Sequence, residues 1–444
     1  MKKIIIITGL FFAVFGQSCA QKSQKGFAVT VESLNYKAGD TLFLAQYIGE
    51  KVDTLMLNIM KNSGFTIFAD KTPLNPGIYK IIQTPDKTFD FFISENQPQH
   101  FSITFNRNDL PKSIVFKGSP ENSVAYSFYR FVNQPNISER AVMDSVSYLI
   151  KYYPQYCFAD YLSLKQKLKD TVPVIPMLIQ NRDSAVREFY FKYVREHFFD
   201  AVNFNSKALT GIPDFELKMQ DYFTQILSQD KDITIKYLDI FLDKLAENKP
   251  VYQFAVKYLS KLYLQAPYES LKEVYPYILQ KYIIEKPQMW NNSVFIAETE
   301  QKLKMLTINP IGGKAADLAL QTPEEQTVKI SDSQAAYTVL YFYDPDCSTC
   351  QEVTPVVYEL FRQYENKDLN FYAIYTEYNK SIWTDYIAEK NMTWINVWDS
   401  KNSQQLTLKY DLSLLPSIYV LDAQKQVILR DCTPEALEAF LKGL

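Results

Sequence analysis

Between residues 27 and 119, apolar and polar side chains alternate along the chain in short runs. Turn-forming residues such as Gly39-Asp40 and Pro76-Gly77 separate these runs. A period of two residues places every second side chain on one face of a strand, so each run predicts a half-buried strand. Eight such runs at even spacing are typical of a β-sandwich. The predicted strands cover residues 27–34, 41–47, 53–59, 64–69, 77–83, 88–94, 100–106 and 114–117.

From about residue 121 to residue 306, apolar positions recur every three to four residues. Val186, Phe189 and Tyr193 belong to one such stripe, and breakers such as Gly211 and Pro213 lie between the stripes. This period predicts amphipathic helices, so we expect an all-α region whose aromatic stripes form its core rather than a ligand groove. The predicted helices cover residues 122–133, 139–152, 161–168, 184–198, 214–229, 232–247, 250–265 and 269–284.

Beyond residue 307 the two patterns alternate. Residues 337–343 form an apolar run of β-branched and aromatic residues whose length suits a buried strand. A helix follows, and the later segments continue the alternation, which predicts an α/β domain. These later segments are a strand at 369–375, a helix at 381–390, an extended piece at 394–397, a helix at 402–410, strands at 417–422 and 426–430, and a helix at 434–441.

A Cys-x-x-Cys motif, Cys347-Ser348-Thr349-Cys350, stands where the helix after the buried strand is predicted to begin. We expect Asp346 to be the N-cap of this helix. A thiol at a helix N-terminus meets unpaired N–H groups and the positive end of the macrodipole, and both favour its thiolate. Because one helical turn separates the two sulfurs, they can form a disulfide. The motif therefore predicts a redox-active dithiol.

The other cysteines and the two histidines limit which further thiol or metal sites the chain can form. The chain has five cysteines, and the motif contains the only close pair. Cys157 lies in an aromatic helical context and is interpreted as a buried thiol, and Cys432 is interpreted as inert. One Cys-x-x-Cys with two histidines in the whole chain does not make a zinc-ligand set, so no metal is expected.

Composition and charge limit the number of domains and the kinds of partner that we expect. The 444 residues are too many for one ordinary domain, and 47% hydrophobic with 22% charged residues is ordinary for a folded protein. The formal net charge is -3, which provides no electrostatic footprint for nucleic acid. We therefore expect no nucleic-acid partner.

Residues 1–18 have the pattern of a secretory leader, with two lysines before an apolar run at 4–15 that is short for a membrane span. The ending G-Q-S-C at Cys19 resembles a bacterial lipobox. This resemblance implies that Cys19 is lipidated, that residues 19–26 are a tether, and that the protein is anchored through lipid in the cell envelope, facing the periplasm, with the outer membrane as the expected site. A plain cleavage site after Ala20 is the alternative.

Several stretches resemble thioredoxin-like envelope lipoproteins of Gram-negative bacteria, with the C-terminal segment resembling the TlpA-like branch of the thioredoxin superfamily. The matching stretches are residues 64–68, 76–81 and 116–122 for an N-terminal sandwich domain, residues 196–215 and 273–277 for a helical insert domain of unassigned function, and residues 311–318 for the motif that opens the TlpA-like domain, in which Ala316 replaces the usual proline.

This resemblance implies a thioredoxin fold for the C-terminal segment and assigns roles within it. Cys347 would be the nucleophile and Cys350 the resolving cysteine, with their redox-active disulfide in place of any bound cofactor. Pro416 would follow a cis peptide bond and face the motif across a groove; an ordinary proline at the start of a strand is the alternative. Partners would be disulfide-containing client proteins and a membrane electron donor of the thiol-relay kind. The groove residues would be Leu415, Pro416, Ser348 and Thr349.

The chain departs from the family pattern at two places. Members often carry a buried acid on the preceding strand or a glutamate three residues after the second cysteine, and those places hold Tyr341 and Val353. The related peroxiredoxins place a proline and a threonine or serine before their cysteine, where this chain has Leu340 and Asp344. Peroxide reduction is therefore disfavoured, and the resolving step lacks an obvious base.

Two functions fit the sequence. The first is a cell-envelope thiol–disulfide oxidoreductase, most simply a reductase, that acts through a mixed disulfide. The alternative is a thioredoxin-like binding or scaffold lipoprotein with low turnover, for which the missing acids would be the signature. The predicted organisation is a lipoprotein signal peptide at 1–18, a tether at 19–26, an all-β sandwich at 27–119, an all-α region at 120–306 and a thioredoxin-like α/β domain at 307–444.

Overall fold

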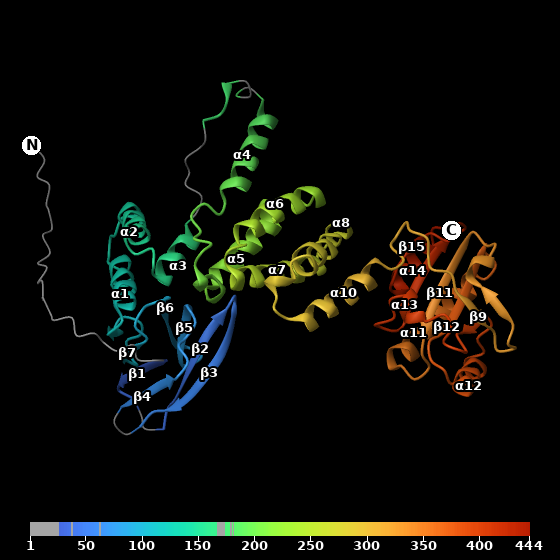
Figure 1. The fold of residues 1–444 in the computed structure, drawn as a ribbon, viewed down its shortest axis with the longest axis horizontal. Helices are drawn as coiled ribbons and strands as arrows, with labels where there is room; N and C mark the ends of the chain where they lie inside the picture. Colours follow the sequence, from blue (N-terminus) through green and yellow to red (C-terminus); the bar gives the residue numbers. More distant parts are fainter. Residues whose placement is uncertain (1–25, 37–38, 62–63, 167–173, 178–179, 181) are drawn as a thin grey trace, which may run out of the picture. The chain divides into compact units, whose positions relative to one another are not determined.

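The computed structural model describes residues 26–36, 39–61, 64–166, 174–177, 180 and 182–444 (Figure 1). The chain forms two compact units, residues 1–258 and residues 259–444, and each is described by itself. The predicted leader and the predicted lipidation site at Cys19 lie outside the described residues. Across the part of the chain that is described, no helix is both long and apolar enough to cross a membrane.

The first unit begins with two four-stranded sheets, ordered β4-β1-β7-β8 and β3-β2-β5-β6. Aromatic rings from β6 and β7 join the sheets, with centroids 5.1 Å apart for Phe89–Phe105 and 5.8 Å apart for Phe91–Phe101. The predicted sandwich is confirmed. Its strands are β1 (Phe27–Leu34), β2 (Thr41–Ile48), β3 (Lys51–Ile59), β4 (Phe65–Asp70), β5 (Gly77–Thr84), β6 (Lys87–Ile93), β7 (His100–Asn106) and β8 (Val115–Lys117).

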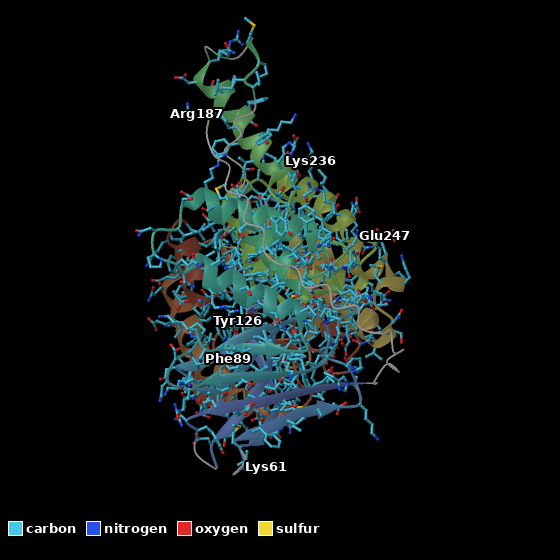
Figure 2. All side chains as sticks on the ribbon, turned by 90° about the vertical axis from the view of Figure 1, so that its left-hand side faces the viewer. Lys61, Phe89, Tyr126, Arg187, Lys236 and Glu247 are labelled. Carbon is cyan, nitrogen blue, oxygen red and sulfur yellow. The ribbon has the colours of Figure 1, made fainter. Side chains whose placement is uncertain are left out.

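Helices then follow the sandwich, as predicted. Tyr126 of α1 packs against the sheets and its hydroxyl donates to the backbone oxygen of Asp90, 2.7 Å away (Figure 2). The predicted helix at 214–229 is shorter, because α5 passes into a π-helical turn at Tyr222–Ile226. The helices are α1 (Pro120–Val132), α2 (Glu139–Tyr152), α3 (Cys157–Lys165), α4 (Asp183–His197), α5 (Pro213–Asp221), α6 (Lys231–Lys244) and α7 (Lys249–Leu264), with a 3₁₀ turn at Lys207–Gly211.

The second unit starts within α7, at Leu259, and short helices follow where one helix at 269–284 was predicted. The chain forms α8 (Glu269–Lys272), α9 (Val274–Ile278) and a π-helical turn at Leu279–Ile284. The break has a simple cause, because Pro276 has no N–H to donate to the carbonyl of Lys272. A further helix, α10 (Ser293–Thr307), was not predicted separately, since its apolar stripe is weak.

The C-terminal domain is built on a seven-stranded sheet ordered β10-β9-β13-β12-β11-β14-β15. The central strand β11 pairs parallel to β12 and antiparallel to β14. The α/β prediction is confirmed, and the strands predicted at 337–343, 369–375 and 417–422 have the observed bounds. The strands are β9 (Ala319–Gln321), β10 (Thr327–Lys329), β11 (Tyr337–Tyr343), β12 (Leu369–Tyr375), β13 (Ile395–Trp398), β14 (Ser417–Asp422) and β15 (Val427–Leu429).

Side chains of β11 enter two hydrophobic clusters, one on each face of the sheet. Val339 and Tyr341 pack in the cluster that α11, α12 and α14 cover, whereas Leu340 and Phe342 pack against α13 and residues 315–330. Strands buried on both faces read as continuous apolar runs, which explains why the sequence marked β11 clearly. The helices are α11 (Ser348–Tyr364), α12 (Lys380–Lys390), α13 (Leu406–Lys409) and α14 (Pro434–Leu441).

The predicted helix at 402–410 is reduced to the single turn α13. Asn402 and Gln405 have positive φ angles of 50° and 49°, which interrupt a helix. Asp399 accepts hydrogen bonds from the backbone N–H groups of Ser403 and Gln404, at 2.9 and 2.7 Å. Side-chain bonds to the backbone of this kind compete with helical ones, so a turn replaces the first half of the predicted helix.

Candidate active site

The Cys-x-x-Cys motif lies where β11 passes into α11. Asp344 organises the turn between them, because its carboxylate accepts from the N–H of Asp346 at 3.0 Å and its carbonyl accepts from the N–H of Cys347 at 3.1 Å. The predicted N-cap at Asp346 is wrong: the N-cap is Cys347, whose sulfur accepts from the N–H of Cys350 at 3.4 Å. The turn held by Asp344 leaves the Asp346 side chain exposed and brings the thiol to the capping position.

The two sulfurs have different surroundings. Cys347 is half-buried, whereas Cys350 is fully buried in the cluster under α11. Burial raises the pKa of Cys350 to about 12, and a backbone hydrogen bond at Asp344 opposes part of that rise. Both cysteines are free thiols in the structure. The arrangement therefore has one accessible sulfur that receives an N–H and one sheltered thiol that holds its proton.

The loop before β14 faces the accessible sulfur. The Leu415–Pro416 peptide bond is cis, and the carbonyl oxygen of Leu415 lies 3.7 Å from the sulfur of Cys347. Leu415 and Pro416 are half-buried, and the preceding Leu414 is 76% exposed. On the other side, Ser348 and Thr349 are exposed in the first turn of α11. The residues assigned to the groove are thus divided between the Cys347 turn and the Leu415 loop, which approach each other at Cys347.

The site lacks a carboxylate at the two places where the family pattern has one. Tyr341 is buried on β11, and its hydroxyl lies 2.7 Å from the hydroxyl of Thr354. Thr354 donates its own hydrogen to the carbonyl of Cys350 at 2.7 Å, so Tyr341 must be the donor to Thr354. Val353 is half-buried and packs against the same cluster. Burial raises the pKa of Tyr341, which keeps its hydroxyl neutral.

The Thr354 contact was not predicted. Thr354 lies four residues after Cys350, so it shares a helix face with that cysteine, and this spacing is a signal that the sequence contained. The sequence gives no such spacing signal for the contacts of Arg430 and Asp431, because their partners are distant in sequence.

The other cysteines lie in ordinary packing. Cys157 is buried in the first unit, where burial raises its pKa. Cys432 is half-buried at the edge of the cluster that holds the motif, and burial raises the pKa of Cys432 to about 12. Within the residues that the structure describes, no three histidine, cysteine or acidic side chains gather in a way that could hold a metal ion.

A family model matches most of the C-terminal domain, and several solved structures are similar to parts of this chain. The model of the AhpC/TSA family matches residues 311–430. A domain of a possible thiol-disulfide isomerase from Cytophaga hutchinsonii is 33% identical over 31% of this chain and 94% of its own, with a TM-score of 0.30. A thioredoxin-like protein from Bacteroides caccae is 22% identical over 62% of this chain and 99% of its own, with a TM-score of 0.47.

A third solved structure is the thioredoxin domain of a thiol-disulfide oxidoreductase from Bacteroides vulgatus, 18% identical over 30% of this chain and 98% of its own, with a TM-score of 0.28. Among curated proteins, none matches this chain.

Proposed function

Because the C-terminal part of this chain belongs to the thioredoxin-like AhpC/TSA family, we propose that it is a thiol–disulfide oxidoreductase that reduces client disulfides through Cys347 and Cys350. One observation carries the proposal. The half-exposed sulfur of Cys347 stands between the N–H of Cys350, 3.4 Å away, and the carbonyl of Leu415, 3.7 Å away. An accessible thiol with a hydrogen-bond donor for its thiolate, beside the backbone of the loop that contains the cis proline, suits attack on an extended disulfide-containing segment.

The reaction is a two-electron exchange. The thiolate of Cys347 attacks one sulfur of a client disulfide, forms the Cys347–client disulfide and releases the other client sulfur as a thiolate. Cys350 then loses its proton and attacks the sulfur of Cys347, which forms the Cys347–Cys350 disulfide and releases the second client thiolate. The client gains two electrons, and an external dithiol donor must reduce the Cys347–Cys350 disulfide before another turnover.

The cellular setting belongs to the same proposal. The lipobox-like G-Q-S-C at Cys19 supports a lipid anchor in the cell envelope, with the redox domain facing the periplasm. In that compartment thiols are exposed to oxidation, so a reductase needs electrons from across the membrane. A membrane thiol-relay protein is the kind of donor that this chemistry requires.

Insulin reduction tests the proposal directly. Full-length protein with dithiothreitol as the donor should precipitate insulin faster than dithiothreitol alone. The Cys347→Ser variant should lose this acceleration completely, whereas Cys157→Ser, a buried thiol in the other unit, should keep it. Equal rates for the wild type and Cys347→Ser would reject a thiol-dependent activity.

A second candidate is a binding protein with a thioredoxin fold and little turnover. The observation that favours it is the buried Cys350 thiol, whose pKa of about 12 is accompanied by Tyr341 and Val353 where the family pattern has acids. Such a protein would form a mixed disulfide with clients and release them slowly. Single-turnover measurements separate the two functions, because a scaffold would form the mixed disulfide at a normal rate and resolve it in hours.

A further inference from the structure

The loop that touches Cys347 is held at both ends by side chains. It spans residues 411–417, between α13 and β14, and contains the cis Leu415–Pro416 bond. At its start, one carboxylate oxygen of Asp411 accepts from the N–H of Ser413 at 3.2 Å and from its hydroxyl at 2.7 Å. This side-chain turn fixes the chain direction just before Leu415.

The second carboxylate oxygen of Asp411 faces Arg430, with 3.8 Å between the carboxylate oxygen and the guanidinium nitrogen. Both side chains are largely buried, at 16% and 20% exposure, so water screens this pair less than it would a surface pair. Arg430 follows directly after β15, the neighbour of β14, and so lies beside the loop in the sheet.

The guanidinium of Arg430 has a second anchor in α10. It donates to the carbonyls of Met305, at 2.6 Å, and of Leu306. These carbonyls belong to the last turn of the helix and have no helical donor of their own, and the negative end of the macrodipole favours a cation there. The rigid guanidinium fork therefore connects the C-terminus of α10 to Asp411.

The end of the loop is held by the next residue along the chain. Asp431 accepts from the hydroxyl of Ser417 at 2.9 Å, and Ser417 is fully buried directly after Pro416. Asp431 has a φ of 46°, in the left-handed region that aspartate tolerates better than most residues. After this turn the N–H of Cys432 donates to the carbonyl of Ile418 in β14 at 3.0 Å, next to Ser417.

We propose that Arg430 and Asp431 are positioning residues of the redox site, which hold the two ends of the 411–417 loop so that Leu415 and Pro416 stay aligned with Cys347 for a protein client. Arg430 transmits the position of α10 to this loop because the same guanidinium binds both. The inference rests on the proposed function, since alignment matters only if a client lies across the loop.

Two consequences follow for the kinetics. The binding of a protein client that lies along the loop depends on the position of the loop. Loosening the loop should therefore raise KM for that client more than it lowers kcat. A small aromatic disulfide needs only the sulfur of Cys347, so its rate should not change. A purely structural role in domain stability would affect both substrates together.

The test uses full-length Arg430→Met and Asp431→Ala variants, with the conservative Arg430→Lys and Asp431→Asn beside them. Arg362→Met is the matched control, because Arg362 pairs with Glu365 at the exposed end of α11, on a different element. Hydrogen exchange of the amides at 412–415 and 417 measures the loop itself. Insulin and 5,5′-dithiobis(2-nitrobenzoate) are the protein and small disulfides.

We expect faster hydrogen exchange at these amides in Arg430→Met and Asp431→Ala. The conservative variants should keep part of the protection against exchange, and Arg362→Met should keep all of it. KM for insulin should rise about tenfold, the effect of losing one charged contact to the loop, at an unchanged rate with the small disulfide. Unchanged exchange in both variants would overturn the clamp. Faster exchange with an unchanged KM would overturn its role in client positioning. If the wild type reduces neither disulfide, the proposed function fails, and the exchange data still decide whether the clamp exists.

Discussion

At the scale of single residues, Val353 offers the sharpest test of how the resolving step obtains its base. It lies three residues after Cys350 on α11 and is half-buried against the same cluster. We expect Val353→Glu to accelerate release of the client from the mixed disulfide by about tenfold or more, because a nearby carboxylate can take the proton of Cys350. Rapid-quench single turnovers measure this step. Val353→Gln is the matched control. Equal acceleration by both variants would contradict the hypothesis that the carboxylate takes the proton of Cys350.

The pH dependence of the same step follows from Cys350. Burial raises its pKa from an ordinary value of 9.0 to about 12, so only a small thiolate fraction exists at neutral pH. As long as the pH is below the pKa, this fraction grows about tenfold for each unit by which the pH rises. The resolving rate should therefore rise with the same slope between pH 7 and 9. Single turnovers across that range measure the slope. A plateau near neutral pH would show instead that another group accepts the proton.

The places of the Cys-x-x-Cys motif and of the cis proline in the fold were predictable because their sequence signals are local. Cys347 and Cys350 form a motif at a strand-to-helix boundary, and Leu415 and Pro416 stand directly before a predicted strand. The N-cap was predicted one residue too early, since a thiol is a less familiar cap than a carboxylate. Arg430 could not be assigned from sequence, because its partners at Met305 and Leu306 lie more than 100 residues away.

At the scale of elements, Asn122 explains how the first helix is attached to the sandwich. Its side-chain amide donates to the carbonyl of Phe92 and accepts from the N–H of Phe92, both at 2.8 Å, and it is fully buried. Asn122→Ala would leave both backbone groups unpaired in the core and should lower the free energy of unfolding of the first unit by about 3 kcal/mol. Urea denaturation measures this change.

Ser127→Ala is the control for that measurement, because Ser127 is exposed on the same helix and its hydroxyl bonds to that helix: it donates to the carbonyl of Ser123 at 2.7 Å and accepts from the guanidinium of Arg130 at 3.3 Å. We expect a change within about 0.5 kcal/mol for this variant. A similar loss in both variants would mean that helix propensity, and not the Asn122–Phe92 pair, sets the stability of this junction.

Elements that leave a long apolar run or a clear apolar stripe in the sequence were predicted well, and elements that leave neither were not. The strands β11, β12 and β14 are buried on both faces, and α2 and α14 have clear apolar stripes. In contrast, β9 and β10 have three residues each, and α10 has only a weak apolar stripe, so these elements leave no long pattern in the sequence. Pro276 shows how a single missing N–H divides a segment whose periodicity alone favoured one helix.

At the scale of the whole molecule, the proposed lipid anchor at Cys19 would determine where the C-terminal domain works. When the chain is expressed with its leader in a Gram-negative host, we expect the wild type in the membrane fraction and Cys19→Ser in the soluble fraction, because serine lacks the sulfur to which the proposed lipid would be attached. Detergent phase partition and the intact mass of the mature chain measure the difference. Cys432→Ser is the control, and equal partition of the wild type and Cys19→Ser would contradict the anchor.

We propose that Cys347 exchanges disulfides with client proteins and that Cys350 releases them. The most direct measurement is to express full-length Cys350→Ser and identify covalent adducts by non-reducing electrophoresis and mass spectrometry. We predict adducts that disappear on reduction, map to Cys347 and are absent in the Cys347→Ser, Cys350→Ser double variant. No adduct at Cys347 in Cys350→Ser, or the same adducts in the double variant, would contradict the account.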